Sequence, residues 1–217
     1  AKMGLYPEDV AIRNCLANSW EDLKELCNYY GVEDFKKAAA LSMPVTDKRD
    51  EPETPESIAK LAVKILHLRK DDHAADLCCG KGSVMLEMHQ ACPSAHISGY
   101  EINPLAANIA GIRAYASDSN VYVKTCDVFD LPGKDIRFDK IFSNYPFGMN
   151  LRQLGTGQRY LEQIAYHVPT IRKATSSDWV FNCLIMDLLN HDGRAVAIMT
   201  NGSTWNTIDA DTRKYFV

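Results

Sequence analysis

The segment Asn144-Tyr145-Pro146-Phe147 has the clearest chemical potential in the chain, and it directly follows an apolar stretch at residues 138–143. The exocyclic amine of a base such as adenine is a poor nucleophile, because its lone pair is delocalised into the ring. The side-chain oxygen of Asn144 and the main-chain carbonyl of Tyr145 can accept both amine hydrogens and favour a pyramidal nitrogen. Pro146 would stiffen the turn, and Phe147 would offer a ring against which an extruded base can stack. The alternative interpretation is a plain loop with an exposed aromatic residue.

A glycine-containing turn lies earlier in the chain, in the segment Asp76-Leu77-Cys78-Cys79-Gly80-Lys81-Gly82-Ser83. Glycines at positions 80 and 82 allow a sharp turn and a close approach of the backbone to a ligand, just before the free N–H groups that begin a helix. The third glycine of the dinucleotide fingerprint is replaced by Met85, so that fingerprint is not met. Taken alone, this segment is also compatible with an ordinary tight turn.

Two acidic residues follow later apolar stretches. Glu101, with Ile102 after it, comes about 20 residues past the glycine turn, where a carboxylate can accept both hydroxyls of a ribose. In the alternative interpretation, Glu101 is solvated, and its negative charge stabilises the N-terminus of a helix beginning at Pro104. Asp127 could bind an adenine amino group, or it could form a plain Asx-turn.

The elements that must position these residues alternate along the chain. We expect strands near residues 73–78, 96–101, 121–125, 138–143 and 194–200, with helices near 83–90, 104–116 and 178–189. Regular alternation of this kind predicts an α/β fold with a doubly wound, mostly parallel sheet. Ligands of such sheets bind outside the carboxyl ends of the strands, where all of the residues named above would lie.

A helix is expected to open this α/β region, with Thr54 as its N-cap and Pro55 at its first position. Apolar residues recur in it at helical spacing and predict one buried stripe, made of Ile58, Leu61, Ala62, Ile65 and Leu66. Residues 1–50 differ in character: Ser19 and Asp22 resemble a capping box, and a second short helix is expected near residues 34–41. We therefore expect a helical N-terminal segment at 1–50 and an α/β domain at 51–217.

Composition narrows the functional classes. The 217 residues carry a net charge of -4, which argues against strong unaided binding of nucleic acid. The seven cysteines show neither paired Cys-x-x-Cys spacing nor a matched Cys/His pattern, so we expect no metal and no disulfide framework. No apolar run is long enough for a membrane span, and no secretion signal is visible, so a soluble cytoplasmic protein is the expectation.

Together the motifs resemble class I S-adenosylmethionine-dependent methyltransferases, and among them the DNA adenine methylase (modification) subunit of type I restriction-modification systems. The resemblance spans roughly residues 53–217. Glu53-Thr54-Pro55 looks like a Thr-Pro segment that packs over the methionine end of the cofactor. Residues 76–83 are similar to Asp-Pro-x-Cys-Gly-Ser-Gly, Glu101-Ile102-Asn103-Pro104 matches the acidic loop, and residues 144–148 are similar to Asn-Pro-Pro-Phe-Gly.

The resemblance implies S-adenosyl-L-methionine as cofactor, adenine in DNA as substrate, a restriction-modification system as context, and a separate specificity subunit as partner, with no membrane. The implied catalytic residues are Asn144, Tyr145, Pro146 and Phe147. The implied cofactor-binding residues are Thr54, Asp76, Cys78, Gly80, Gly82, Glu101, Ile102, Asp127 and Asn144.

Three departures from the family pattern are Leu77 for a proline, Lys81 for a small residue and Tyr145 for the first proline of the catalytic motif. The family domain also continues past the position of Val217, so the domain is expected to be incomplete at its C-terminus. Two alternatives remain: an RNA or protein-glutamine methyltransferase of the same fold, and a degenerate module that binds without catalysing.

Overall fold

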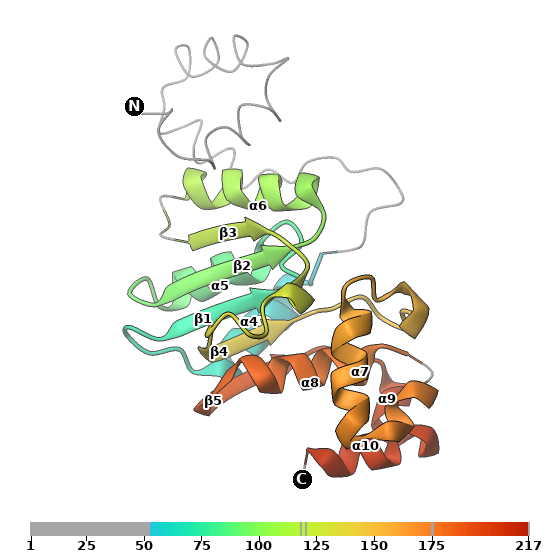
Figure 1. Ribbon diagram of the computed structural model, residues 1–217. Coiled ribbons are helices and arrows are strands. Elements are labelled where there is room, and N and C mark those ends of the chain that lie inside the picture. The colour runs from blue at the N-terminus through green and yellow to red at the C-terminus, as the bar shows by residue number, and fades with distance from the viewer. Residues whose placement is uncertain (1–52, 118, 120, 175, 217) are drawn as a thin grey trace, which may run out of the picture.

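A parallel sheet forms the centre of the molecule, which a computed structural model describes for residues 53–117, 119, 121–174 and 176–216. Its strands are β1 (His73–Leu77), β2 (His96–Glu101), β3 (Val121–Thr125), β4 (Phe138–Ser143) and β5 (Leu189–Ala197). They lie in the order β3-β2-β1-β4-β5, and every neighbouring pair is parallel (Figure 1). The strand order reverses between β1, β2 and β3 on one side and β4 and β5 on the other. The predicted doubly wound α/β fold is therefore confirmed.

One face of the sheet is covered by α4 (Glu56–Leu66), α5 (Ser83–Ala91) and α6 (Pro104–Ala116). Successive residues of a strand point to opposite faces, so alternate strand positions supply the sheet side of this layer. Its buried residues include Leu66 of α4, Met85 of α5 and Ala110 of α6, which pack with Ala74 and Phe142 of the strands.

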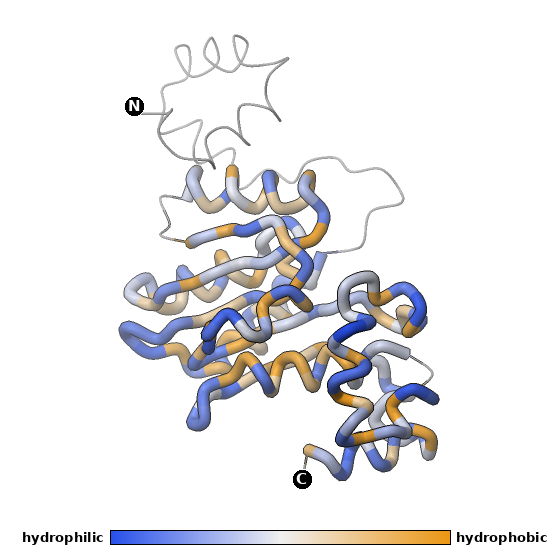
Figure 2. Tube along the Cα trace, viewed as in Figure 1, coloured by the Kyte–Doolittle hydropathy of each residue, from blue (hydrophilic) through white to orange (hydrophobic). Residues whose placement is uncertain are grey.

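The opposite face is covered by α7 (Gly157–His167) and α8 (Asp178–Leu188). Leu184 and Leu188 of α8 pack with Ala75 and Ile141 of the strands. The tube of α8 is largely orange in Figure 2, because this helix is apolar on most of its surface. A helix that is apolar nearly all round is typical of a buried position.

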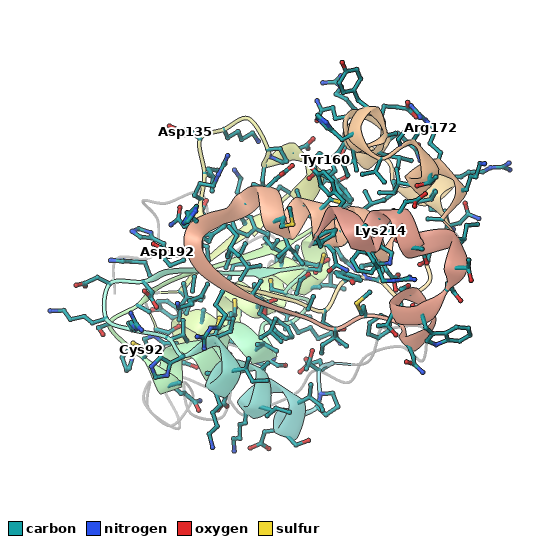
Figure 3. All side chains as sticks on the ribbon, turned by 90° about the horizontal axis from the view of Figure 1, so that it is seen from below. Cys92, Asp135, Tyr160, Arg172, Asp192 and Lys214 are labelled. Carbon is teal, nitrogen blue, oxygen red and sulfur yellow. The ribbon has the colours of Figure 1, made fainter. Side chains whose placement is uncertain are left out.

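Short helices gather beyond the carboxyl ends of β4 and β5 (Figure 1). They are η2 (Leu151–Gln153), η3 (Pro169–Lys173), α9 (Asn201–Trp205), η4 (Thr207–Asp209) and α10 (Ala210–Tyr215), while η1 (Val128–Asp130) follows β3. Seen from below, Arg172 of this group lies at one end of the molecule, on the opposite side from Cys92 and Asp192 (Figure 3). The buried Asp178 ties the group to α8 by accepting hydrogen bonds from the Thr200 backbone N–H (3.1 Å) and the Ser203 hydroxyl (2.8 Å).

The helix that opens the domain differs from its prediction in two ways. Pro55 is the N-cap and the helix starts at Glu56, so Thr54 makes no capping hydrogen bond. The buried face consists of Ala59, Ala62, Val63 and Leu66, whereas the larger apolar residues of the predicted stripe, Ile58, Leu61 and Ile65, are exposed. The helix packs on α5, β4 and β5, and small side chains allow that close approach.

Two further differences concern the second half of the chain. The last strand spans Leu189–Ala197 rather than 194–200, since Leu189 pairs with Phe138 before a register irregularity and Arg194 resumes the ladder opposite Lys140. Helix α7 is absent from the predicted elements. The predicted helical segment at 1–50 lies outside the described residues. No helix in the described part of the chain is long and apolar enough to cross a membrane.

Candidate active site

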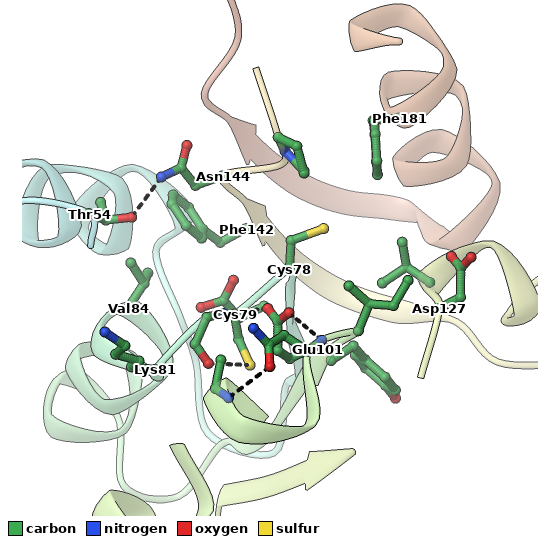
Figure 4. A pocket seen from close by; sticks show the side chains of 18 of the residues that line it. Thr54, Cys78, Cys79, Lys81, Val84, Glu101, Asp127, Phe142, Asn144 and Phe181 are labelled. Atoms are coloured by element: carbon green, nitrogen blue, oxygen red, sulfur yellow. Dashed lines mark hydrogen bonds between the residues drawn. The ribbon is translucent and has the colours of Figure 1, made fainter. Parts of the chain in front are cut away.

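A cavity of about 440 Å³ opens at the carboxyl ends of the strands, where the strand order reverses. Segments that are far apart in the sequence meet there: the entry to α4, the glycine turn after β1, and the ends of β2, β3 and β4 (Figure 4). Of the predicted site residues, the cavity is lined by Thr54, Asp76, Cys78, Gly80, Glu101, Ile102, Asp127, Asn144 and Pro146. Gly82, Tyr145 and Phe147 do not line it.

The glycine turn has the backbone that its sequence predicts. Gly80 and Gly82 have φ angles of +54° and +87°, and Cys78 shares this left-handed conformation at +67° although it carries a side chain. A Cβ atom on Gly82 would come within 2.4 Å of the Met85 side chain and 3.1 Å of Ala110. Gly82 therefore lets α5 and α6 pack closely behind the cavity, while Gly80 forms part of the cavity wall.

Asp76 presents a buried acceptor to the site. Its side chain is 1% exposed, and Oδ1 has no hydrogen-bond partner among the described residues. Burial raises the pKa of Asp76 well above its usual value, and the negative charge of Glu101 raises it further, against the effect of a hydrogen bond from the Met85 backbone. A buried acceptor of this kind is normally paired, so Asp76 is prepared for a donor or cation entering the cavity.

Glu101 is held in place by two backbone N–H groups. Oε2 accepts a hydrogen bond from Gly80 (2.9 Å) and Oε1 accepts one from Asn103 (2.8 Å). Both oxygens keep further lone pairs, because an ionised carboxylate has about four acceptor positions. The glycine turn and the acidic strand end thus form one rigid unit, with the exposed side chain of Ile102 beside it.

Asp127 makes the hydrogen bond that is expected of an Asx-turn, the second of the two roles that its sequence position suggested. Oδ1 accepts a hydrogen bond from the Phe129 backbone N–H (3.0 Å), which caps η1, and Oδ2 accepts one from the Thr156 hydroxyl (2.6 Å). The second bond links the end of β3 to the residue before α7. Asp127 also lines the cavity, so this contact holds one of its walls.

Asn144 follows the last residue of β4. Its side-chain Nδ2 donates a hydrogen bond to Thr54 Oγ1 (3.0 Å), drawn as a dashed line in Figure 4. Its Oδ1 is buried and has no hydrogen-bond partner among the described residues. The amide thus has a fixed donor end and an acceptor end that is unpaired, and Pro146 lies nearby in the cavity wall.

The two aromatic residues of the predicted catalytic segment point in different directions. The Tyr145 side chain is 1% exposed and packs in the core, so only its main chain is available for the predicted role. Phe147 is 55% exposed outside the cavity, on the same turn.

Several lining residues were not predicted. Glu53 accepts hydrogen bonds from the Ser83 hydroxyl and from Arg113 Nη1 (3.4 Å), and Arg113 also donates to the Lys81 carbonyl (2.8 Å). The remaining unpredicted lining residues include Met149, Gln153, Leu154 and Phe181. Met149, Gln153 and Leu154 come from the loop after β4, for which the sequence predicted no element, and Phe181 comes from α8, whose helix was predicted but not its place beside the cavity.

A sequence profile of the family described as N-6 DNA Methylase matches residues 47–217 of the chain. The chain belongs to this family. Its fold is that of class I methyltransferases, and its cofactor is S-adenosyl-L-methionine, as the resemblance implied.

Similar proteins support the fold. The methyltransferase subunit of a type I restriction-modification system from Streptococcus thermophilus has a TM-score of 0.62 and 19% identity, covering 83% of this chain and 40% of that one. A class I methyltransferase of Listeria monocytogenes, described as putative, has a TM-score of 0.62 and 16% identity. The match covers 97% of this chain and 66% of that one.

A curated relative, a tRNA1(Val) (adenine(37)-N6)-methyltransferase of Porphyromonas gingivalis, is 28% identical over 132 residues, which are 58% of this chain and 49% of the relative. The match thus spans about half the length of this relative.

The site suits the cofactor. The unpaired Oδ1 of Asp76 can accept from an ammonium group, and Glu101 offers remaining lone pairs to ribose hydroxyls. Four acidic residues among those that line the cavity favour a ligand bearing positive charge.

Proposed function

We propose that this protein methylates the exocyclic N6 amine of adenine in DNA. The observation that carries the proposal is the Asn144 side chain in the cavity wall, whose buried Oδ1 has no hydrogen-bond partner in the part of the chain that the structure describes. An amine hydrogen of the target would supply the missing donor. Unpaired buried acceptors are rare in native proteins and call for a ligand or a water molecule.

The chemistry is a direct displacement. The bound cofactor supplies a methyl group on a positively charged sulfur. The Asn144 Oδ1 and the Tyr145 carbonyl accept the two amine hydrogens, so the nitrogen lone pair leaves the ring and points at the methyl carbon. When bound, S-adenosyl-L-methionine would give up its methyl group to this nitrogen with the electron pair of the C–S bond left on sulfur, and the extra proton on nitrogen would pass to water. The protein mainly contributes positioning.

Seven of the nine residues that the resemblance assigns to the cofactor divide into two groups, while Thr54 and Asn144 are bonded to each other in the cavity wall. Asp76, Gly80, Glu101 and Ile102 would contact it, as would Cys78, whose side chain also lines the cavity. Gly82 and Asp127 would act by shaping the walls, because their contacts are made with the protein itself.

A restriction-modification system, with a separate specificity subunit as partner, is the context that we assign to the activity. The fold similarity to the Streptococcus thermophilus subunit supports this assignment. The net charge of -4 also supports it, since a partner would supply the positive charge needed to hold DNA.

Transfer to adenine in tRNA is the second candidate. Two curated relatives from Porphyromonas gingivalis strains carry the name tRNA1(Val) (adenine(37)-N6)-methyltransferase, at 28% and 35% identity over parts of the chain. The same acceptors at Asn144 would serve either polymer, so the site chemistry alone favours neither.

The first experiment is calorimetric titration with S-adenosyl-L-methionine, comparing the wild-type chain with Glu101→Ala. Binding that is weakened at least tenfold by the substitution is expected, because the ribose would lose two hydrogen bonds. Transfer of labelled methyl groups to duplex DNA, tRNA and release-factor protein then separates the candidates. Asn144→Ala serves as the control, since it should bind the cofactor normally and transfer nothing. A folded wild-type chain that binds no cofactor would contradict the proposal and favour a non-catalytic module.

A further inference from the structure

The hydrogen bond between Thr54 and Asn144 joins two parts of the site that lie 90 residues apart in the sequence. Thr54 comes from the segment that enters α4, and Asn144 comes from the end of β4. Because Thr54 accepts from Nδ2, the other end of the amide, Oδ1, is the end left for the target. The two residues face each other directly in Figure 4.

We infer that Thr54 is a positioning residue that holds the Asn144 amide with its oxygen available to the target amine, an inference that rests on the proposed function. An Asn amide can turn by half a revolution and exchange its oxygen and nitrogen. In the turned state Nδ2 would meet the target amine, and two donors cannot pair with each other. Reaching the turned state would break the Nδ2–Thr54 bond, and the Thr54 hydroxyl would have to turn its own hydrogen toward the amide oxygen to replace it.

The segment bearing Thr54 is itself firmly held. Glu53 is bound by the Ser83 hydroxyl at the start of α5 and by Arg113 of α6, and both partners of the Glu53–Arg113 ion pair have little exposed surface. The backbone next to Thr54 is therefore fixed to the helices behind the glycine turn. Thr54 can therefore hold the Asn144 amide in place, instead of moving together with it.

The sequence resemblance gives Thr54 a different task, direct contact with the cofactor. These two roles predict different measurements. A residue that contacts the cofactor changes its dissociation constant, whereas a residue that positions Asn144 changes kcat at an unchanged dissociation constant.

The test compares Thr54→Val, which replaces the hydroxyl by a methyl group, with Thr54→Ser, which keeps the hydroxyl. Thr125→Val, at an exposed position at the end of β3 and outside the cavity, is the matched control. For Thr54→Val we expect kcat to fall by roughly tenfold to a hundredfold, because the acceptor is no longer fixed and Nδ2 is left unpaired. The dissociation constant of S-adenosylhomocysteine should stay within about threefold, and Thr54→Ser should restore kcat.

Hydrogen exchange provides a readout that needs no methyl transfer. The side-chain amide protons of Asn144, assigned in NMR spectra by their loss in Asn144→Asp, should exchange at least tenfold faster in Thr54→Val than in wild type, since the bond that protects them is gone. A fall in kcat matched by an equal weakening of S-adenosylhomocysteine binding would overturn the inference, as would unchanged exchange. If wild type methylates no adenine-containing polymer, the proposed function fails, and the exchange measurement still decides the role of Thr54.

Discussion

The ring of Tyr145 stacks on the ring of Phe181, with centroids 4.8 Å apart and an angle of 11° between the planes. The Tyr145 hydroxyl also donates a hydrogen bond to Asn182 Oδ1 (3.3 Å). Tyr145 directly follows Asn144, so helix α8 anchors the turn that carries the candidate catalytic amide. The family pattern has a rigid proline at this position, and in this chain the buried ring provides rigidity by packing.

The anchor predicts unequal effects of two substitutions at Tyr145. Tyr145→Phe keeps the stack and loses one hydrogen bond, so the free energy of unfolding should fall by about 0.5–1.5 kcal/mol. Tyr145→Ala leaves a cavity under the turn and should lower the free energy of unfolding by about 3–5 kcal/mol. Denaturant unfolding measures both, and equal losses would show that the ring does not anchor the turn.

The buried Asp76 predicts a pH dependence of stability. Its pKa is raised in the folded protein by burial and by Glu101, so the folded state holds this proton more tightly than the unfolded chain. The resulting stabilisation is complete below the unfolded pKa of about 3.9 and is lost as the pH rises through the higher folded pKa. The contribution of Asp76 to the free energy of unfolding of the cofactor-free protein should therefore decline as the pH rises above about 4, so the stability of wild type relative to Asp76→Asn should fall with pH. Unfolding curves at several pH values test this, and identical slopes would contradict it.

The bond from Thr156 to Asp127 predicts that a residue outside the cavity affects ligand binding. Thr156→Val removes the only hydrogen bond that these two side chains share and frees the loop around Gln153 and Leu154, which line the cavity. We expect faster backbone amide exchange at residues 150–156 and severalfold weaker cofactor binding, because the loop must then be ordered on binding. Asp127→Asn is the control, since an Asn amide can still pair with both partners. Unchanged exchange in Thr156→Val would refute the role of this contact.

The left-handed backbone at Cys78 predicts a difference between two small replacements. At a φ of +67°, a Cβ atom costs energy that glycine does not incur. Cys78→Gly should therefore be more stable than Cys78→Ala by about 1 kcal/mol. Both variants lose the thiol. The difference between their free energies of unfolding, measured with denaturant, therefore reports the cost of a Cβ atom in this backbone conformation. An Ala variant at least as stable as the Gly variant would argue against strain at this residue.

The strands and the strand-end residues could be predicted from sequence because their signals are local. Each of the first four strands is a short apolar stretch bounded by turn residues, and the rule for parallel sheets then brings Asp76, Glu101, Asp127 and Asn144 to one edge. The structure places all four around one cavity.

The features that escaped prediction depend on contacts between distant segments. In α4 two apolar stripes overlap, and the smaller one, with Ala59 and Ala62, is buried because its neighbours lie close. The bonds from Thr54 to Asn144 and from Glu53 to Arg113 join residues 90 and 60 positions apart, and no periodicity encodes them.

The acidic lining of the cavity bears on turnover. Glu53, Asp76, Glu101 and Asp127 line it together with Lys81, so acidic groups outnumber the basic one among the described lining residues. The sulfur of the spent cofactor has lost its positive charge along with the methyl group, and an acidic surround attracts the neutral sulfur less than the charged one. The same side chains that favour the fresh cofactor would therefore hold the spent one less tightly, which helps the cavity to exchange one for the other.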